Sequence, residues 1–308
     1  MPIKLPRDLP AKEALDNENI FTITDTRAST QDIRPLRIAI LNLMPKKVIT
    51  ETQLCRVLSN TSLQVELTLL YPYAHKSAHT SDDYIMQFYR STKDVMDEKF
   101  DGLIITGAPV EKMEFDEVSY WDEIVKLNEW SKTNVYSTLY ICWAAFAGLY
   151  MNYGIKKVGL EKKLSGVYEH KLCTTRHELV RGFDEKFYVP HSRWSEPCRE
   201  QIEVCGELEV IARSDEAGIY LVGSKDKRTF YITGHSEYDF DTLDAEYRRD
   251  KAKNPDTPIP AHYYPDDNPR KKPLNVWRAH SNLLFSNWLN YFVYQETPYD
   301  INKIKEKL

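Results

Sequence analysis

The sequence predicts an α/β fold in which a doubly wound, mostly parallel sheet carries helices on both faces. From about residue 36, apolar runs of strand length alternate with amphipathic helical stripes, which is typical of βαβ units. The composition, with 42% hydrophobic and 28% charged residues, is ordinary for a globular protein. A chain of 308 residues is also long enough to bury a sizeable core.

The chain is divided into three parts by its composition. Residues 1–34 are polar and carry several prolines, so we expect an extended N-terminal arm. Such an arm is ordered where it lies on another surface, either its own domain or a second subunit of a homodimer. We assign residues 35–296 to a single α/β domain and residues 297–308 to a C-terminal tail.

The first strand and helix of the domain are predicted between the arm and residue 58. The run RIAILNL (37–43) is continuously apolar, as a buried strand is. Thr50 and Gln53 have the spacing of a capping box, which marks a helix start. The apolar residues within 54–58 then follow on one helical face.

The alternation continues toward the middle of the chain. Strands are predicted at 65–71, 100–107 and 135–142. Helices are predicted from 119–122 onward and over 143–151. We therefore expect the carboxyl ends of several parallel strands to meet at one edge of the sheet.

The pattern changes in the second half of the chain. Short strand candidates with few helices between them fit an extension of the sheet plus an antiparallel part. Residues 254–273 hold six of the 16 prolines and are a candidate lid over a substrate. An amphipathic helix over 276–291 closes the domain.

Cysteine usage and charge narrow the class of protein. The five cysteines are scattered, without a C-x-x-C pair, which argues against a disulfide framework or a cysteine zinc site and favours a reducing compartment. No signal peptide or membrane span is visible, so we expect a cytoplasmic protein. A net charge of -5 offers no basic footprint for nucleic acid.

Cys142 lies where an apolar strand meets an alanine-rich helix, in YICWAAFAG. Such a junction lifts one side chain above the sheet edge at which ligands bind. The helix start favours the reactive thiolate, and the backbone N–H of Trp143 could stabilise an oxyanion. Taken alone, Cys142 reads better as a small buried core residue.

The segment RTFYITGHSEYD supplies a base for this nucleophile. His235 and Glu237 end a strand-like run, and residues i and i+2 of a strand face the same side. A carboxylate can then hold one imidazole nitrogen while the other faces the thiol. The combination with Cys142 is more specific than either motif alone.

Together these segments resemble the class I glutamine amidotransferase-like fold and, within it, the homoserine O-acyltransferases of methionine biosynthesis. The resemblance covers nearly the whole chain. It rests on DIRPLRIAILNLMPKK, ITETQLCRVLSN, LIITGAPVE, YICWAAFAGL, PHSRWSE, GHSEYD and HYYPDDNP.

The resemblance implies a ping-pong acyl transfer from acyl-CoA to homoserine, with no other cofactor. Cys142 would form the acyl-enzyme, His235 would act as the base and Glu237 would orient it. Backbone N–H groups of Trp143 and Val110 are the candidate oxyanion donors, because Pro109 has none.

Four further positions match substrate contacts of that family. Arg249 would pair with the homoserine carboxylate, Lys163 would bind substrate near the acyl donor, and Ser192 would line the acyl pocket. Glu111 matches the position that separates acetyl from succinyl users. A glutamate there would fill the succinyl space and repel its carboxylate, so we expect acetyl-CoA.

Three alternatives stay open on the sequence. A succinyltransferase keeps the mechanism but uses succinyl-CoA. A cysteine hydrolase or glutaminase shares the triad, although the Ile141 and Trp143 flanks differ from the glycines typical of glutaminases. A binding module without chemistry is the last. No metal is expected, since His75 and His79, an i, i+4 pair, lack a nearby acidic third ligand before Asp82.

Overall fold

The computed structural model describes residues 3–6, 8–18, 22–23, 34–74, 80–174, 176–305 and 307. Within them a 12-stranded sheet has the order β2-β1-β4-β3-β6-β7-β12-β11-β10-β8-β9, with β5 paired to β4. The strands are β1 (Ile3–Lys4), β2 (Thr22–Ile23), β3 (Leu36–Leu41), β4 (Val65–Tyr71), β5 (Tyr89–Ser91), β6 (Phe100–Ile105), β7 (Val135–Ile141), β8 (Lys157–Leu172), β9 (Lys186–Pro197), β10 (Leu208–Ser214), β11 (Gly218–Ser224) and β12 (Thr229–Ile232).

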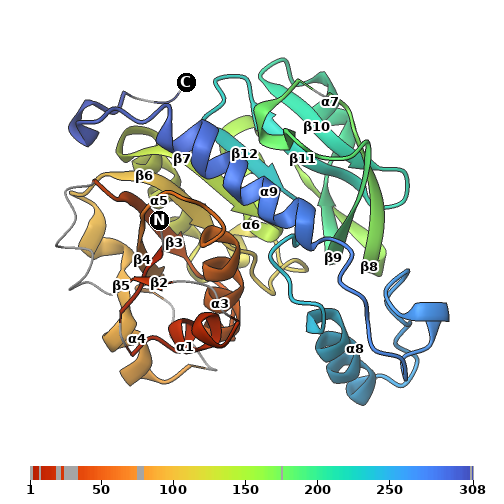
Figure 1. Ribbon diagram of the computed structural model, residues 1–308. Helices are drawn as coiled ribbons and strands as arrows, with labels where there is room; N and C mark the ends of the chain where they lie inside the picture. The colour runs from red at the N-terminus through yellow and green to blue at the C-terminus, as the bar shows by residue number, and fades with distance from the viewer. Residues whose placement is uncertain are drawn as a thin grey trace.

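Helices cover both faces of this sheet, as predicted (Figure 1). The described α-helices are α1 (Pro10–Asn17), α3 (Lys47–Leu58), α4 (Asp82–Phe88), α5 (Trp121–Asn134), α6 (Trp143–Tyr153), α7 (Arg199–Val204), α8 (Thr242–Lys253) and α9 (Arg278–Asn287), and the π-helix η5 (Trp288–Tyr294) follows α9. Of these, α8 lies apart from the sheet (Figure 1). None of the described helices is long and apolar enough to cross a membrane.

The predicted division into parallel and antiparallel parts is confirmed. Pairing is parallel from β1 through β4, β3, β6 and β7 to β12. It is antiparallel from β12 through β11, β10 and β8 to β9. The carboxyl ends of β3, β6, β7 and β12 therefore lie along one edge of the sheet.

Successive side chains of a central strand point to opposite faces of the sheet and pack in different cores. Ile38 and Ile40 of β3 pack in a core with residues of α1, α3 and α9. Ala39 and Leu41 pack in a second core with residues of α5 and α6. This two-residue alternation is why a central strand must be apolar along its whole length.

The arm was expected to be extended, but its described residues include helix α1 between two short strands. β1 pairs with β4 through Ile3↔Val65, and Leu9, Ala11 and Leu15 are buried in the core beside α3. The apolar face of α1 needs a partner. The arm finds that partner on its own domain.

The predicted start of helix α3 is wrong by four residues, because Thr50 was the expected N-cap and Lys46 is the observed one. Thr50 is inside the helix and does not cap it, because α3 begins at Lys47. Asn42 holds this earlier turn, since its Nδ2 donates to the Lys47 carbonyl at 3.2 Å. The Lys47 ammonium donates in return to the Asn42 carbonyl at 2.6 Å.

Strand β8 was not predicted from the sequence. Its residues are mostly polar and lack a clean two-residue alternation. It nevertheless forms a long hairpin with β9, and the register between them shifts between Gly159 and Leu164. Gly159 pairs with Ser195, whereas Leu164 pairs with Arg193, so residues 160–163 bulge out of the ladder.

Candidate active site

The junction between β7 and α6 places Cys142 at the carboxyl edge of the sheet. Cys142 has φ 53° and ψ −117°, in the left-handed half of backbone space that costs energy for any residue except glycine. Its N–H donates to the Ile232 carbonyl of β12 at 2.7 Å, which holds the turn. The sharp turn leaves the thiol in the wall of a cavity rather than in the core alone.

His235 and Glu237 come from the segment after β12. His235 Nδ1 lies 2.7 Å from Glu237 Oε1, and both side chains are buried. The two residues were expected at the end of a strand, but β12 ends at Ile232 and the pair lies in a turn. The His235 N–H donates to the Pro190 carbonyl of β9 at 2.8 Å, which draws the chain out of the sheet.

Electrostatics favours a charged imidazole in this setting. Burial alone would lower the pKa of His235, but the Cys142 thiolate and the Glu237 carboxylate outweigh it and raise that pKa well above its ordinary value. Both partners also hydrogen-bond the ring. The imidazole of His235 is thus favoured in its charged form beside Cys142 and Glu237.

Two neighbours fix the position of the imidazole. The ring of Tyr238 stacks on His235 with centroids 4.1 Å apart and planes 15° from parallel. Gly107, after β6, approaches from the other direction. A Cβ on Gly107 would lie 3.2 Å from Cys142 Cβ and 3.4 Å from His235 Cε1, so a side chain there would press on both groups.

A cavity of about 800 Å³ opens in front of the thiol. Its wall includes seven of the residues predicted from the sequence: Cys142, His235, Val110, Glu111, Lys163, Ser192 and Arg249. Glu237 contacts His235 Nδ1 and is not part of the wall. Trp143 is wholly buried below it at the start of α6.

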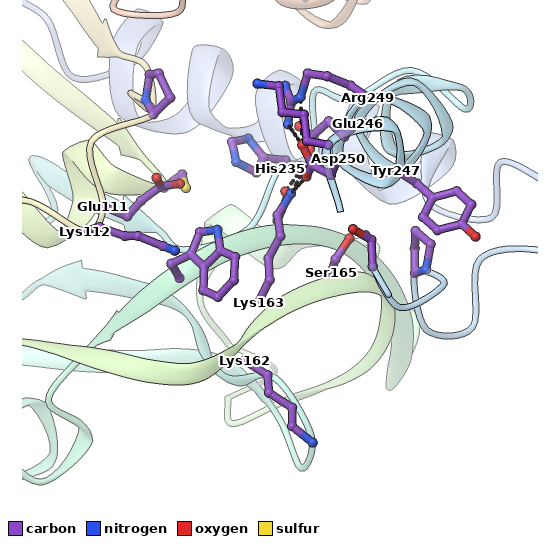
Figure 2. A pocket seen from close by; sticks show the side chains of 18 of the residues that line it. Glu111, Lys112, Lys162, Lys163, Ser165, His235, Glu246, Tyr247, Arg249 and Asp250 are labelled. Carbon is purple, nitrogen blue, oxygen red and sulfur yellow. Dashed lines mark hydrogen bonds and ion pairs between the residues drawn. The ribbon is translucent and has the colours of Figure 1, made fainter. Parts of the chain in front are cut away.

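Glu246 of α8 connects several of these residues, and it was not among the residues predicted from the sequence. Its carboxylate accepts from Ser192 Oγ, from the Tyr238 hydroxyl at 3.1 Å and from Lys163 Nζ at 3.3 Å. It lies one helical turn before Arg249, on a face of α8 that lines the cavity (Figure 2). This i, i+3 spacing is the signal that could have identified it.

Asp250 completes the charged wall. It accepts from Lys163 Nζ at 2.9 Å and pairs with Arg249 at 2.8 Å (Figure 2). Just over half of the Arg249 side chain is exposed (54%), so its guanidinium can still turn toward a ligand.

Glu111 lies on the opposite wall, in the loop after β6. Burial raises its pKa above the usual value, although its own backbone N–H, His235 and Lys163 act in the opposite sense. The Lys157 ammonium donates to the Glu111 carbonyl at 3.1 Å and fixes the loop. Glu111 therefore belongs to a fixed loop that lines the same cavity as the thiol.

The proline-rich segment is divided between two environments. Its first part contributes residues between Asn254 and Pro260 to the cavity wall. Tyr263 and Tyr264 instead pack under α8 with Tyr247 and Trp277, away from the opening. The aromatic residues expected in a lid are therefore part of a small core.

No group of three or more metal-ligating side chains occurs in the part of the chain that the structure describes. His75 and His79, weighed above as a metal pair, lie outside the described residues.

Comparisons with family models and with known proteins point to the same family. The model of the homoserine O-succinyltransferase family matches residues 2–299. Proteins named homoserine O-acetyltransferase are similar over 99% of this chain and 100% of their own length. They are 56% identical in Acetivibrio thermocellus, 54% in Brevibacillus brevis and 55% in Bacteroides thetaiotaomicron.

Solved structures add the fold. A glutamine amidotransferase from Thermotoga maritima superimposes with a TM-score of 0.55 at 12% identity, covering 83% of this chain and 98% of that one. This likeness supports the class I glutamine amidotransferase-like architecture and nothing finer.

Proposed function

The chain belongs to the homoserine O-succinyltransferase family, and we propose that it transfers the acetyl group of acetyl-CoA to the hydroxyl of L-homoserine. The observation that carries the proposal is the 54–56% identity to three homoserine O-acetyltransferases over nearly the full chain. The product would be O-acetyl-L-homoserine, an intermediate of methionine biosynthesis. No cofactor besides the co-substrate is needed for this chemistry.

The first half-reaction is acylation of Cys142. Its thiolate attacks the thioester carbonyl, the tetrahedral intermediate collapses, and CoA leaves with a proton from the His235 imidazolium. The backbone N–H of Trp143 is suited to the oxyanion, because first-turn amides lack an acceptor within their own helix. The N–H of Val110, in the facing loop, is our second donor.

The second half-reaction transfers the acyl group to homoserine. Neutral His235 removes the proton from the hydroxyl as its oxygen attacks the acyl-enzyme, and the Cys142 thiolate leaves. Glu237 holds the imidazole in the required orientation and stabilises its cation.

Charged groups of the wall are suited to the amino acid. Arg249 can pair with the homoserine carboxylate, and Glu246 can accept from its ammonium group. Lys163 lies between Glu246 and Asp250 and neutralises that part of the wall. Ser192 is fixed by Glu246 and borders the acyl group.

The presence of Glu111 favours an acetyl group over a succinyl group as the acyl group that is transferred. Glu111 and Cys142 line the same cavity, so a glutamate side chain there would compete for space with a succinyl chain and repel its carboxylate. Succinyl-CoA is the second candidate, since the matching family model is named for succinyl transfer.

We assign the protein to the cytoplasm, because all five cysteines are free, as expected in a reducing compartment. The described residues of the arm lie on their own domain, so the homodimer considered above gains no support from them.

The test is release of free thiol from acetyl-CoA and succinyl-CoA, each with and without L-homoserine. We expect fast release from acetyl-CoA that depends on homoserine and is lost in Cys142→Ala. Preference for succinyl-CoA would overturn the donor assignment. Release independent of homoserine would point to a hydrolase instead.

A further inference from the structure

The bulge of β8 brings charged residues to the mouth of the cavity. Residues 160–163 have no partners in β9, where Trp194 is the one residue between the paired Arg193 and Ser195. Glu161, Lys162 and Lys163 of the bulge all line the cavity, and so does Trp194. Four residues of β8 opposite one of β9 form an irregularity of the kind that proteins use to redirect side chains at binding sites.

The cations of the inner wall are already neutralised. Lys163 pairs with Glu246 and Asp250, and Arg249 pairs with Asp250. Figure 2 shows these groups converging from α8 and the bulge. This part of the cavity suits a zwitterion such as an amino acid, rather than a group with several negative charges.

Three further lysines of the wall have no carboxylate partner among the described residues: Lys112, Lys162 and, at the end of α8, Lys253. The first two flank Trp194 and the bulge. Lys112 follows Glu111 in the loop after β6, and its ammonium lies 3.6 Å above the centre of the Trp194 ring. Lys162 extends away from His235 and Glu246, whereas its neighbour Lys163 reaches toward Glu246 (Figure 2). Both lysines are exposed and line the cavity.

This separation of charges matches the two ends of an acyl-CoA. The thioester must reach Cys142, while the diphosphate and the 3′-phosphate lie at the far end of the long pantetheine arm. Phosphates are bound by cations, and an unpaired lysine offers its charge without first breaking an ion pair. The exposed lysines of the mouth meet this requirement, and the paired cations of the inner wall do not.

We propose that Lys112 and Lys162 form a subsite for the phosphates of acyl-CoA, with Trp194 holding Lys112 in place. The proposal rests on the function proposed above, because it takes acyl-CoA as the donor. The proposal also gives the bulge a role. The bulge places Lys162 at the mouth of the cavity, while Lys163 pairs with the carboxylates of the inner wall.

The experiment compares two acyl donors that share the thioester and differ in the phosphates. Homoserine-dependent thiol release is measured with acetyl-CoA and with S-acetylpantetheine, which lacks the nucleotide. The variants are Lys112→Ala, Lys162→Ala and the double variant. Lys225→Ala is the matched control, because this exposed lysine precedes β12, at the sheet edge opposite the cavity.

We expect each single variant to lower kcat/KM for acetyl-CoA about tenfold more than kcat/KM for S-acetylpantetheine. The double variant should show the larger difference, and Lys225→Ala none. For the wild type, added salt should lower kcat/KM for acetyl-CoA more than that for S-acetylpantetheine.

Two results would overturn the subsite. One is an equal loss with both donors, which would mean that the lysines support the fold or the thioester end. The other is no loss with either donor. If instead the wild type releases no thiol in the presence of homoserine, the proposed function itself fails, and the two failures are thus distinguished.

Discussion

Gly107 lies against both Cys142 and His235, and this contact makes a sharp test at the scale of one residue. In Gly107→Ala the added methyl would lie 3.2 Å from Cys142 Cβ. We expect kcat/KM for acetyl-CoA to fall roughly 10- to 100-fold, because small misplacements of reacting groups are costly. Gly206→Ala is the control, since its Cβ meets nothing within 4 Å. Equal kinetics in the two variants would contradict the contact.

Glu237 should be visible in the pH profile. Glu237→Gln removes one of the two charges that raise the pKa of His235, so that pKa should fall. In the variant the imidazolium should lose its proton at a lower pH than in the wild type, so the alkaline limb of the profile should move to lower pH. We also expect kcat to fall roughly 10²- to 10⁴-fold. The measurement is kcat/KM for acetyl-CoA against pH, with exposed Glu207→Gln as control. An unshifted alkaline limb would argue against the orienting role.

Glu111 decides the donor in our account. Glu111→Gly should raise the succinyl-CoA to acetyl-CoA ratio of kcat/KM by roughly tenfold or more, because it removes both bulk and negative charge. Glu114→Gly, an exposed substitution nearby on the same segment, should leave the ratio alone. If the ratio is the same in both variants, another residue selects the acyl group.

The sequence identified the residues that carry unusual motifs and missed those that do not. Cys142, His235 and Glu237 stand in specific contexts, and the cavity brings together Glu111, Lys163, Ser192 and Arg249 as well. Glu246 was missed because a single acidic residue on a helix rich in charged residues is usually expected to be a solvent-exposed surface residue. Its importance comes from hydrogen bonds to β9 and β8, which local periodicity does not contain.

At the scale of elements, backbone hydrogen bonds join β8 to the loop after α8, and both segments line the cavity. Val167 N donates to the Ala261 carbonyl, and Ala261 N donates to the Ser165 carbonyl, each at 2.9 Å. Gly166 allows this approach, since a Cβ there would lie 2.3 Å from the Ala261 oxygen.

Gly166→Ala should therefore separate the loop from β8. We expect a loss of about 1–3 kcal/mol in the free energy of unfolding and a rise in KM for both substrates. Urea unfolding and steady-state kinetics measure the two effects. Gly159→Ala, in the same strand with open space around its Cβ, is the control. Similar behaviour of both variants would show that the loop is not held this way.

The parallel strands were predictable because they are buried on both sides, so their sequences are apolar throughout. β8 was not, because its bulge interrupts the register and its outer residues are polar. The start of α3 was misplaced for a similar reason. Asn42 and Lys47 fix the first turn through contacts that a capping pattern does not encode.

At the scale of the whole molecule, buried histidines should make stability depend on pH. His191 Nε2 lies 3.1 Å from His170 Nε2, and His170 Nδ1 lies 2.9 Å from the Tyr168 carbonyl. Burial lowers the pKa of His170 to about 3, and burial with the Arg193 charge lowers that of His191 well below its ordinary value. Burial thus favours the neutral form of both histidines in the folded protein.

In the unfolded chain both histidines take up protons below about pH 6.5, so acid favours unfolding. We expect the free energy of unfolding to fall between pH 7 and pH 5, by up to about 1.4 kcal/mol per pH unit for each histidine. His235, whose pKa is raised, acts in the opposite sense near pH 7, because it is protonated in the folded protein and mostly neutral in the unfolded chain; it offsets part of the loss and adds no change once both states are protonated. Urea titrations at pH 7, 6 and 5 check this, and a flat profile would refute it.

The bond from Cys142 N–H to the Ile232 carbonyl has a consequence for synthesis of the chain. The ribosome makes β7 and Cys142 long before β12 and His235. The strained turn at Cys142 is secured by a strand that has not yet emerged, and such distant pairings form late in folding. The nascent amino-terminal half would therefore carry an ordinary thiol, and reactivity toward thioesters would begin once the second half has joined the sheet.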